Sequence, residues 1–117
     1  MLIGQVSQST GLTTKAIRLY EEKGLIQPPA RRGHYRVYSE EDLDVLQLIV
    51  EAKSLGVTLA QLKGVITYRD GEVDWQKVHQ FLLEVKKNLQ IELDRVLKNI
   101  EKIDNCIESM DSCPKSR

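Results

Sequence analysis

The sequence predicts a mainly α-helical chain with a winged helix-turn-helix head, a two-helix connector and a long C-terminal helix. Three observations predict this order: a helix–glycine–helix pattern in the first 29 residues, the alternating stretch "RRGHYRVYS" at 31–39, and a helical apolar repeat without proline or glycine from about residue 74 to 110. The head and connector are expected at 1–70, a dimerisation helix at 74–112 and a short tail at 113–117.

Charge is divided unevenly along the 117 residues. Residues 1–38 hold six Lys/Arg against two acids, and the remainder holds eleven against fifteen, so a head of +4 precedes a body of −4. A basic head indicates a polyanionic partner.

Two cysteines are too few for a disulfide framework. No apolar run is long enough for a membrane span, and the first residues do not resemble a signal peptide. We therefore expect a cytoplasmic protein that does not associate with a membrane.

The first helix is predicted from about Ile3 to Ser9. Gly11 follows where a tight turn requires positive φ, and Thr13 is a suitable N-cap for a second helix that ends before Gly24. Ile17 is spaced to lock the second helix onto the first, as in a helix-turn-helix. An unspecialised helical hairpin remains the alternative.

The stretch "RRGHYRVYS" is typical of a β-hairpin that turns around Arg32-Gly33. Val37 and one tyrosine would face the helices, while Arg36 and the other ring would face outward. Arginine binds phosphate through a forked guanidinium, and a tyrosine hydroxyl is a neutral donor. The hairpin is therefore interpreted as a wing on a nucleic-acid backbone, with a merely structural charged hairpin as the alternative.

The stretch from Thr10 to Leu43, "TGLTTKAIRLYEEKGLIQPPARRGHYRVYSEEDL", resembles the DNA-binding head of the mercury-resistance (MerR) family of bacterial regulators, and looks most like its copper-responsive branch. One departure is Leu19, where many relatives carry an aromatic residue. The shared marks are Ile17-Arg18, Tyr20-Glu21, Gly24-Leu25, Pro29, Tyr35-Arg36 and Tyr38.

The resemblance implies a recognition helix in the major groove of duplex DNA and a wing on the DNA backbone. Recognition-helix contacts are expected from Thr13, Thr14, Lys15, Arg18 and Tyr20. Wing contacts are expected from Arg31, Arg32, Tyr35, Arg36 and Tyr38.

The connector is predicted as two helices. Ser39 and Asp42 form a capping box for the first, whose apolar stripe is Leu43, Leu46, Ile49 and Val50. Gly56 ends this helix, and Thr58 opens a second one with an apolar face of Leu59, Leu62, Val65 and Ile66. The following "YRDGEVDW" is predicted to be a loop.

The long helix carries a heptad-like seam with one stutter after Leu89. Over roughly 34 residues the helix would be about 50 Å long. The small head alone could not bury the narrow apolar stripe along this length. A helix from a second copy would bury it, and the family resemblance implies that the two pair as an antiparallel coiled coil. The apolar positions are 78, 82, 85, 89, 93, 96, 100, 103, 107 and 110.

The two cysteines lie near the C-terminus. Cys106 is interpreted as a small apolar residue near the seam, with a metal or effector ligand as the alternative. Cys113 falls where metal-sensing relatives place a first thiolate. Those relatives carry a second cysteine further along, but this chain stops at Arg117. His79 of an antiparallel partner could approach Cys113, and thiolate with imidazole suits copper(I) or zinc. Thiol-reactive sensing by Cys113, or no ligand at all, remain alternatives.

The expected function is a homodimeric transcriptional regulator of a palindromic promoter operator. The resemblance implies activation by distortion of an overlong promoter spacer, with bacterial RNA polymerase as a partner. The alternative is an architectural or accessory DNA-binding protein without an effector. An enzyme is not expected, because there is no glycine-rich phosphate loop and His34 and His79 have no evident catalytic partner.

Overall fold

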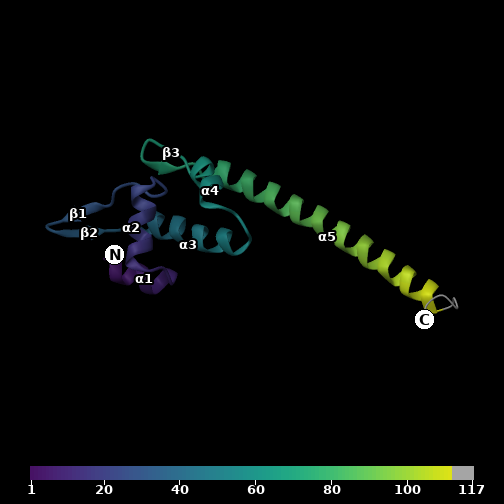
Figure 1. Ribbon diagram of the computed structural model, residues 1–117. Helices are drawn as coiled ribbons and strands as arrows, with labels where there is room; N and C mark the ends of the chain where they lie inside the picture. Colours follow the sequence, from purple (N-terminus) through teal and green to yellow (C-terminus); the bar gives the residue numbers. More distant parts are fainter. Residues whose placement is uncertain (112–117) are drawn as a thin grey trace. The chain divides into compact units, whose positions relative to one another are not determined.

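The computed structural model describes residues 1–111 and confirms a mainly α-helical architecture (Figure 1). The chain divides into two compact units, Met1–Val78 and His79–Arg117. The elements are α1 (Ile3–Thr10), α2 (Thr14–Glu22), β1 (Ala30–Arg32), β2 (Tyr35–Val37), α3 (Glu40–Ser54), α4 (Leu59–Val65), β3 (Tyr68–Arg69), β4 (Glu72–Val73) and α5 (Trp75–Asp111).

The helix-turn-helix consists of α1 and α2. Gly11 ends α1 with a φ of 77°, a left-handed conformation that favours glycine, and its amide donates a hydrogen bond of 2.9 Å to the Ser7 carbonyl. The Thr13 hydroxyl then accepts from the Ala16 amide at 3.1 Å and caps α2. The turn and the cap lie where the sequence predicted them.

The core of the first unit is formed where α1, α2 and α3 meet. α1 contacts both α2 and α3, and Val6 and Ile17 are fully buried between these helices. The connector and the start of α5 add further buried side chains. The core residues are Val6, Ile17, Tyr20, Leu25, Ile26, Tyr38, Val45, Leu46, Ile49, Ala52, Val57, Leu62, Ile66, Val73 and Val78.

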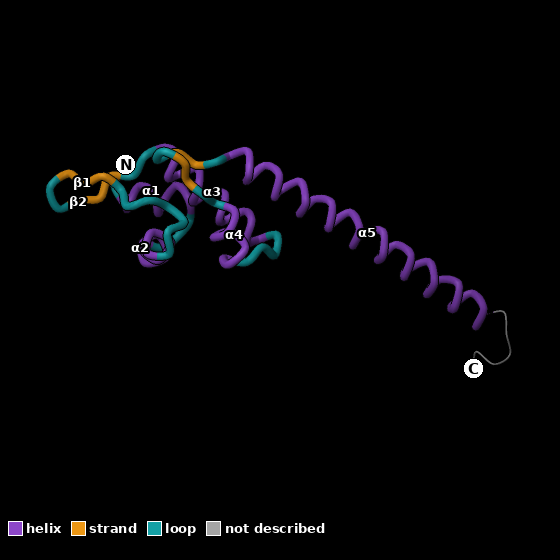
Figure 2. The backbone as a smooth tube through the Cα atoms, turned by 90° about the horizontal axis from the view of Figure 1, so that it is seen from above, coloured by secondary structure: helices purple, strands orange, loops and turns teal. Residues whose placement is uncertain are grey.

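The wing is the antiparallel pair β1 and β2, which extends away from the helices of the head in both views (Figure 2). Its register pairs Ala30 with Val37, Arg31 with Arg36, and Arg32 with Tyr35. Two backbone hydrogen bonds attach the base of the wing to the start of α1. The Tyr38 amide donates to the Met1 carbonyl at 2.7 Å, and the Met1 amino group donates to the Tyr38 carbonyl at 2.9 Å.

The capping box of α3 is present, because the Ser39 hydroxyl accepts from the Asp42 amide and the Asp42 carboxylate accepts from the Ser39 amide. The buried stripe of α3 differs in part from the prediction. Its fully buried members are Val45, Leu46, Ile49 and Ala52, whereas Leu43 and Val50 are half-buried. α3 packs against α1 and also contacts α4, so its buried arc is set by two neighbours and is displaced from the predicted stripe.

The stretch predicted as a loop after α4 is a second hairpin, so that prediction was wrong. β3 and β4 pair Tyr68 with Val73 and Arg69 with Glu72. Asp70 and Gly71 both have positive φ, 54° and 82°, which is the pattern of a tight two-residue hairpin turn. Asp-Gly does interrupt the helical period, but it also reverses the chain within two residues.

α5 begins after Asp74, whose carboxylate accepts from the Lys77 amide at 3.2 Å, and runs to Asp111. In a single chain the seam from Leu89 onward is open to solvent, with side chains 39–59% exposed. The exposed seam residues are Leu89, Leu93, Val96, Ile100, Ile103, Ile107 and Met110. Within residues 1–111, no helix has the length and apolar character needed to cross a bilayer.

Candidate nucleic-acid interface

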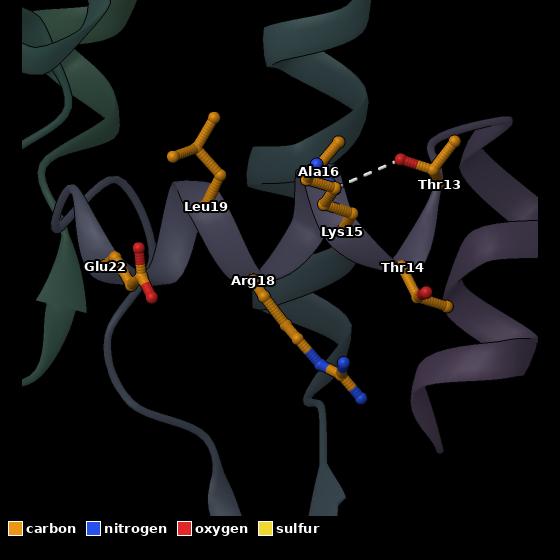
Figure 3. A pocket seen from close by; sticks show the side chains of 7 residues that line it. All are labelled: Thr13, Thr14, Lys15, Ala16, Arg18, Leu19 and Glu22. Atoms are coloured by element: carbon orange, nitrogen blue, oxygen red, sulfur yellow. Dashed lines mark hydrogen bonds between the residues drawn. The ribbon is translucent and has the colours of Figure 1, made fainter.

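The exposed face of α2 forms the first part of the candidate interface. Thr13, Thr14, Lys15, Arg18 and Glu22 line a shallow depression along this helix, together with Ala16 and Leu19 (Figure 3). Arg18 extends away from the helix, and no ion pair of Arg18 occurs within the described residues. Lys15 and Arg18 therefore offer two positive charges on one helix face.

The start of α2 adds backbone donors to this face. The first amides of a helix lack intrahelical partners and attract anions. Thr13 already uses its hydroxyl to cap the helix, so its role in the free chain is structural, whereas the Thr14 side chain is exposed and uncommitted. The Ala16 amide already donates to the Thr13 hydroxyl, so the arrangement suits a phosphate oxygen near the amides of residues 14 and 15.

Two of the sequence-predicted contact residues lie in the core. Tyr20 is 4% exposed and Tyr38 is 2% exposed. A ring in this position cannot reach a base or a phosphate without leaving the core, so we correct the prediction and assign both tyrosines to packing. Val37 and one tyrosine were expected to face the helices, with Arg36 facing outward, and this part of the prediction was wrong. The buried tyrosine is Tyr38, two positions after Arg36 and therefore on the same side of the strand, while Tyr35 is 67% exposed.

The wing supplies the second part of the interface. Arg31, Arg32 and Tyr35 are exposed on its two strands. Arg36 is only partly exposed, because its Nε lies 3.1 Å from the Oε2 of Glu21 on α2. The two atoms form an ion pair without the alignment of a hydrogen bond, and both are shielded from solvent. The wing and α2 are therefore joined by a charged contact.

The Tyr38 hydroxyl lies in the same shielded region and has no hydrogen-bond partner within the described residues. Burial and then the nearby Glu21 carboxylate raise the pKa of Tyr38, while the positive charges of Arg36 and Arg18 act in the opposite direction. The hydroxyl therefore stays protonated at neutral pH and remains a donor.

Sequence reasoning missed the role of Glu21. An acid within a basic head was visible, but the arginine with which it pairs depends on where the base of the wing lies relative to α2. An acid at a helix position three residues after Arg18 is more simply paired within the helix. Only the folded geometry, which brings Arg36 of β2 within 3.1 Å of Glu21, selects Arg36 instead.

The predicted metal ligands do not form a site within the described part of one chain. His79 and Cys106 are both exposed on α5, and their separation of 27 positions corresponds to about 40 Å of helix. In residues 1–111, no three His, Cys, Asp or Glu side chains cluster closely enough to hold an ion. Cys113 lies outside the described residues. The ligands described here do not fit a metal within one chain.

Known proteins share both the head and the whole architecture. The family model "MerR HTH family regulatory protein" matches residues 1–69. The chain is 46% identical over 68 residues to the HTH-type transcriptional regulator CueR of Vibrio cholerae serotype O1, which covers 57% of this chain and 49% of the relative. It therefore aligns with about half the length of that relative.

Two other relatives match over nearly all of the chain. CueR of Salmonella typhi is 31% identical over 119 residues, covering 97% of this chain and 82% of that protein. The crystal structure of MtaN, the N-terminus of the Bacillus subtilis multidrug transporter activator, superposes with a TM-score of 0.63 at 25% identity, covering 92% and 97% of the two chains. The chain therefore belongs to the MerR family of helix-turn-helix transcriptional regulators, which are not enzymes.

Proposed function

We propose that the chain works as a homodimer that binds a two-fold symmetric operator in duplex DNA. The observation that carries this proposal is the exposed cationic surface of the head, where α2 and the wing meet. Its positively charged side chains are Lys15, Arg18, Arg31, Arg32 and the partly exposed Arg36. This surface contrasts with the acidic remainder of the chain.

The helix α2 and the wing each have a shape that suits one kind of DNA contact. An α-helix with its side chains is about 10–12 Å wide and fits the major groove, which is about 12 Å wide. Lys15 and Arg18 on α2 would face base edges and flanking phosphates. Arg31, Arg32 and Tyr35 on the wing would contact the backbone, which positions the protein without reading sequence.

The open seam of α5 supports dimerisation through a second copy of the chain. Seven apolar side chains exposed at heptad-like spacing lose water contact when a matching helix covers them. The family resemblance supports an antiparallel coiled coil. Two heads joined in this way would bind half-sites separated by whole turns of DNA.

We further propose that the dimer activates transcription by distorting an overlong promoter spacer for RNA polymerase, in response to a metal or a thiol-reactive signal. Support comes from the resemblance to the copper-responsive branch and from Cys113, which falls where metal-sensing relatives place a first thiolate. The donors described in one chain do not form a closed site, so a metal would need donors from a second chain or from the tail. An effector-independent architectural or accessory DNA-binding protein is the second candidate, since the same cationic surface would serve it without a sensor.

Selection of binding sites from a random duplex library tests the main proposal. We expect an inverted repeat, bound by a species with twice the mass of the chain in sedimentation. Affinity should fall steeply with salt, as it does for contacts to several phosphates. Recovery of a single asymmetric site bound by a monomer would refute the dimeric mode, and binding without any sequence preference would favour the architectural alternative.

A further inference from the structure

Glu21 places a negative charge inside the cationic surface of the head. Its neighbour Glu22 is exposed and lies on the α2 face that lines the depression, as expected of a residue that merely repels phosphate. Glu21 is different, because only 14% of its side chain is exposed. An acid at a DNA interface opposes binding through Coulomb repulsion, so its burial there calls for a compensating role.

That role is visible in the contact with the wing. Oε2 of Glu21 lies 3.1 Å from Nε of Arg36, and both atoms are shielded from water. Within the described residues the two terminal nitrogens of Arg36 form no hydrogen bond or ion pair, and 28% of the side chain remains exposed. One edge of the guanidinium is thus committed to Glu21, while its four terminal N–H donors stay available.

The register of the wing gives a second reason for the pair. Arg31 and Arg36 are directly opposite one another in β1 and β2. Like charges at directly opposed positions repel and destabilise a hairpin. The Glu21 carboxylate offsets one of the two charges, so the wing can hold two arginines at adjacent positions.

We propose that Glu21 is a positioning residue for DNA binding, which fixes Arg36 so that its terminal N–H groups meet a phosphate. The inference rests on the proposed function. A long, flexible arginine loses rotamer freedom when it grips a phosphate, and a side chain that is already held loses less. Glu21 therefore increases DNA affinity even though its own charge is repelled by DNA.

The sign of a mutational effect separates positioning from repulsion. Glu21→Ala and the matched control Glu22→Ala each remove one negative charge from adjacent positions of α2. Glu22→Ala should tighten operator binding severalfold. Glu21→Ala should weaken it by about tenfold, the scale of one lost charge-assisted contact, and should flatten the salt dependence as a lost phosphate contact does.

The same two variants made in an Arg36→Ala background complete the test. Without Arg36 there is nothing to position, so Glu21→Ala should now tighten binding, as Glu22→Ala does. Affinity is measured by fluorescence anisotropy on the operator selected from the random library, with circular dichroism as the check on folding. Glu21→Gln, which keeps the shape and an acceptor oxygen, should weaken binding less than Glu21→Ala and serves if the alanine variant does not fold.

Tighter binding by Glu21→Ala or Glu21→Gln in the otherwise wild-type chain would overturn the inference. So would an equal loss of affinity with and without Arg36, because it would assign Glu21 to folding alone. Failure of the wild-type chain to bind any duplex in this assay would instead overturn the proposed function, so the two failures are distinguishable.

Discussion

The hydroxyl of Tyr68 donates a hydrogen bond of 2.9 Å to the backbone carbonyl of Leu25, joining residues 43 positions apart. A second contact reinforces it, since the Val73 amide donates to the Glu41 carboxylate at 3.3 Å. The β3–β4 hairpin is thereby attached both to the segment that follows α2 and to α3. The hairpin that precedes α5 is therefore part of the head's packed structure.

Tyr68→Phe should lower the free energy of unfolding by about 1 kcal/mol, the usual net contribution of one hydrogen bond. The Leu25 carbonyl would lose its partner while the ring would still pack. Urea denaturation followed by circular dichroism measures the change. Tyr35→Phe is the control, because the Tyr35 ring is 67% exposed and should leave stability unchanged. Equal stability of the two variants would mean that the Tyr68 hydrogen bond adds nothing.

Tyr68 also predicts a loss of stability in alkali. Burial, followed by the charges of Asp42 and Glu41, raises the pKa of Tyr68 from 10.0 to about 12. Below pH 10 the hydroxyl is protonated in both folded and unfolded chains. Between pH 10 and 12 the unfolded chain releases this proton and the folded chain does not, so stability decreases as pH rises. Ultraviolet titration of tyrosinate should show a late-titrating group that Tyr68→Phe removes; an unchanged titration curve would contradict the assignment.

Arg31→Ala should weaken DNA binding to a similar extent on operator and on unrelated duplexes. A phosphate contact adds affinity without sequence information, and its loss should reduce the slope of log affinity against log salt by about one. Lys63→Ala on α4, outside the proposed surface, is the control. Anisotropy titrations over a range of salt concentrations supply both numbers. An unchanged slope of log affinity against log salt would mean that Arg31 makes no phosphate contact.

Ile100→Asp should dissociate the proposed dimer. The side chain is 50% exposed in one chain and lies in the middle of the seam, where burying an unpaired charge costs several kcal/mol. Operator affinity should fall with it, because one head makes half the contacts. Lys102→Asp, exposed and outside the seam, should leave the dimer intact. A dimeric Ile100→Asp variant in sedimentation would place the interface elsewhere.

Cys113→Ser should abolish any metal- or oxidant-dependent change in transcription and leave basal operator binding intact, whereas Cys106→Ser should have little effect. The distinction comes from the sequence: Cys113 directly precedes Pro114, which cannot continue a helix, whereas Cys106 lies inside the helical repeat. In vitro transcription with copper(I), zinc and a mild oxidant in turn is the measurement. If neither variant alters a response, the chain does not sense through sulfur, and the architectural alternative is strengthened.

Local signals in the sequence were sufficient for the head's helices and their ends. Gly11 and Gly24 take the positive φ that their positions suggested, and Thr13 and Ser39 cap the helices that follow them. These features depend on a few neighbouring residues, so they can be predicted from a short window. The wing followed from alternation in the same way. The Asp-Gly hairpin was equally local and was missed because its two-residue strands are too short to show alternation.

What the sequence by itself determined was therefore the order of elements, the basic head and the apolar seam, since each is a periodic or compositional property of the chain. The tertiary structure alone decided which tyrosine of the wing is buried, which acid holds Arg36 and what Tyr68 contacts. Alternation puts Tyr35 on the face of Val37 and Tyr38 on the face of Arg36, but it does not show which of these two faces is covered by the helices. Partners separated by 15 to 43 positions are selected by packing between elements, because several charges and carbonyls compete for each and only the folded geometry brings one of them within 3.1 Å.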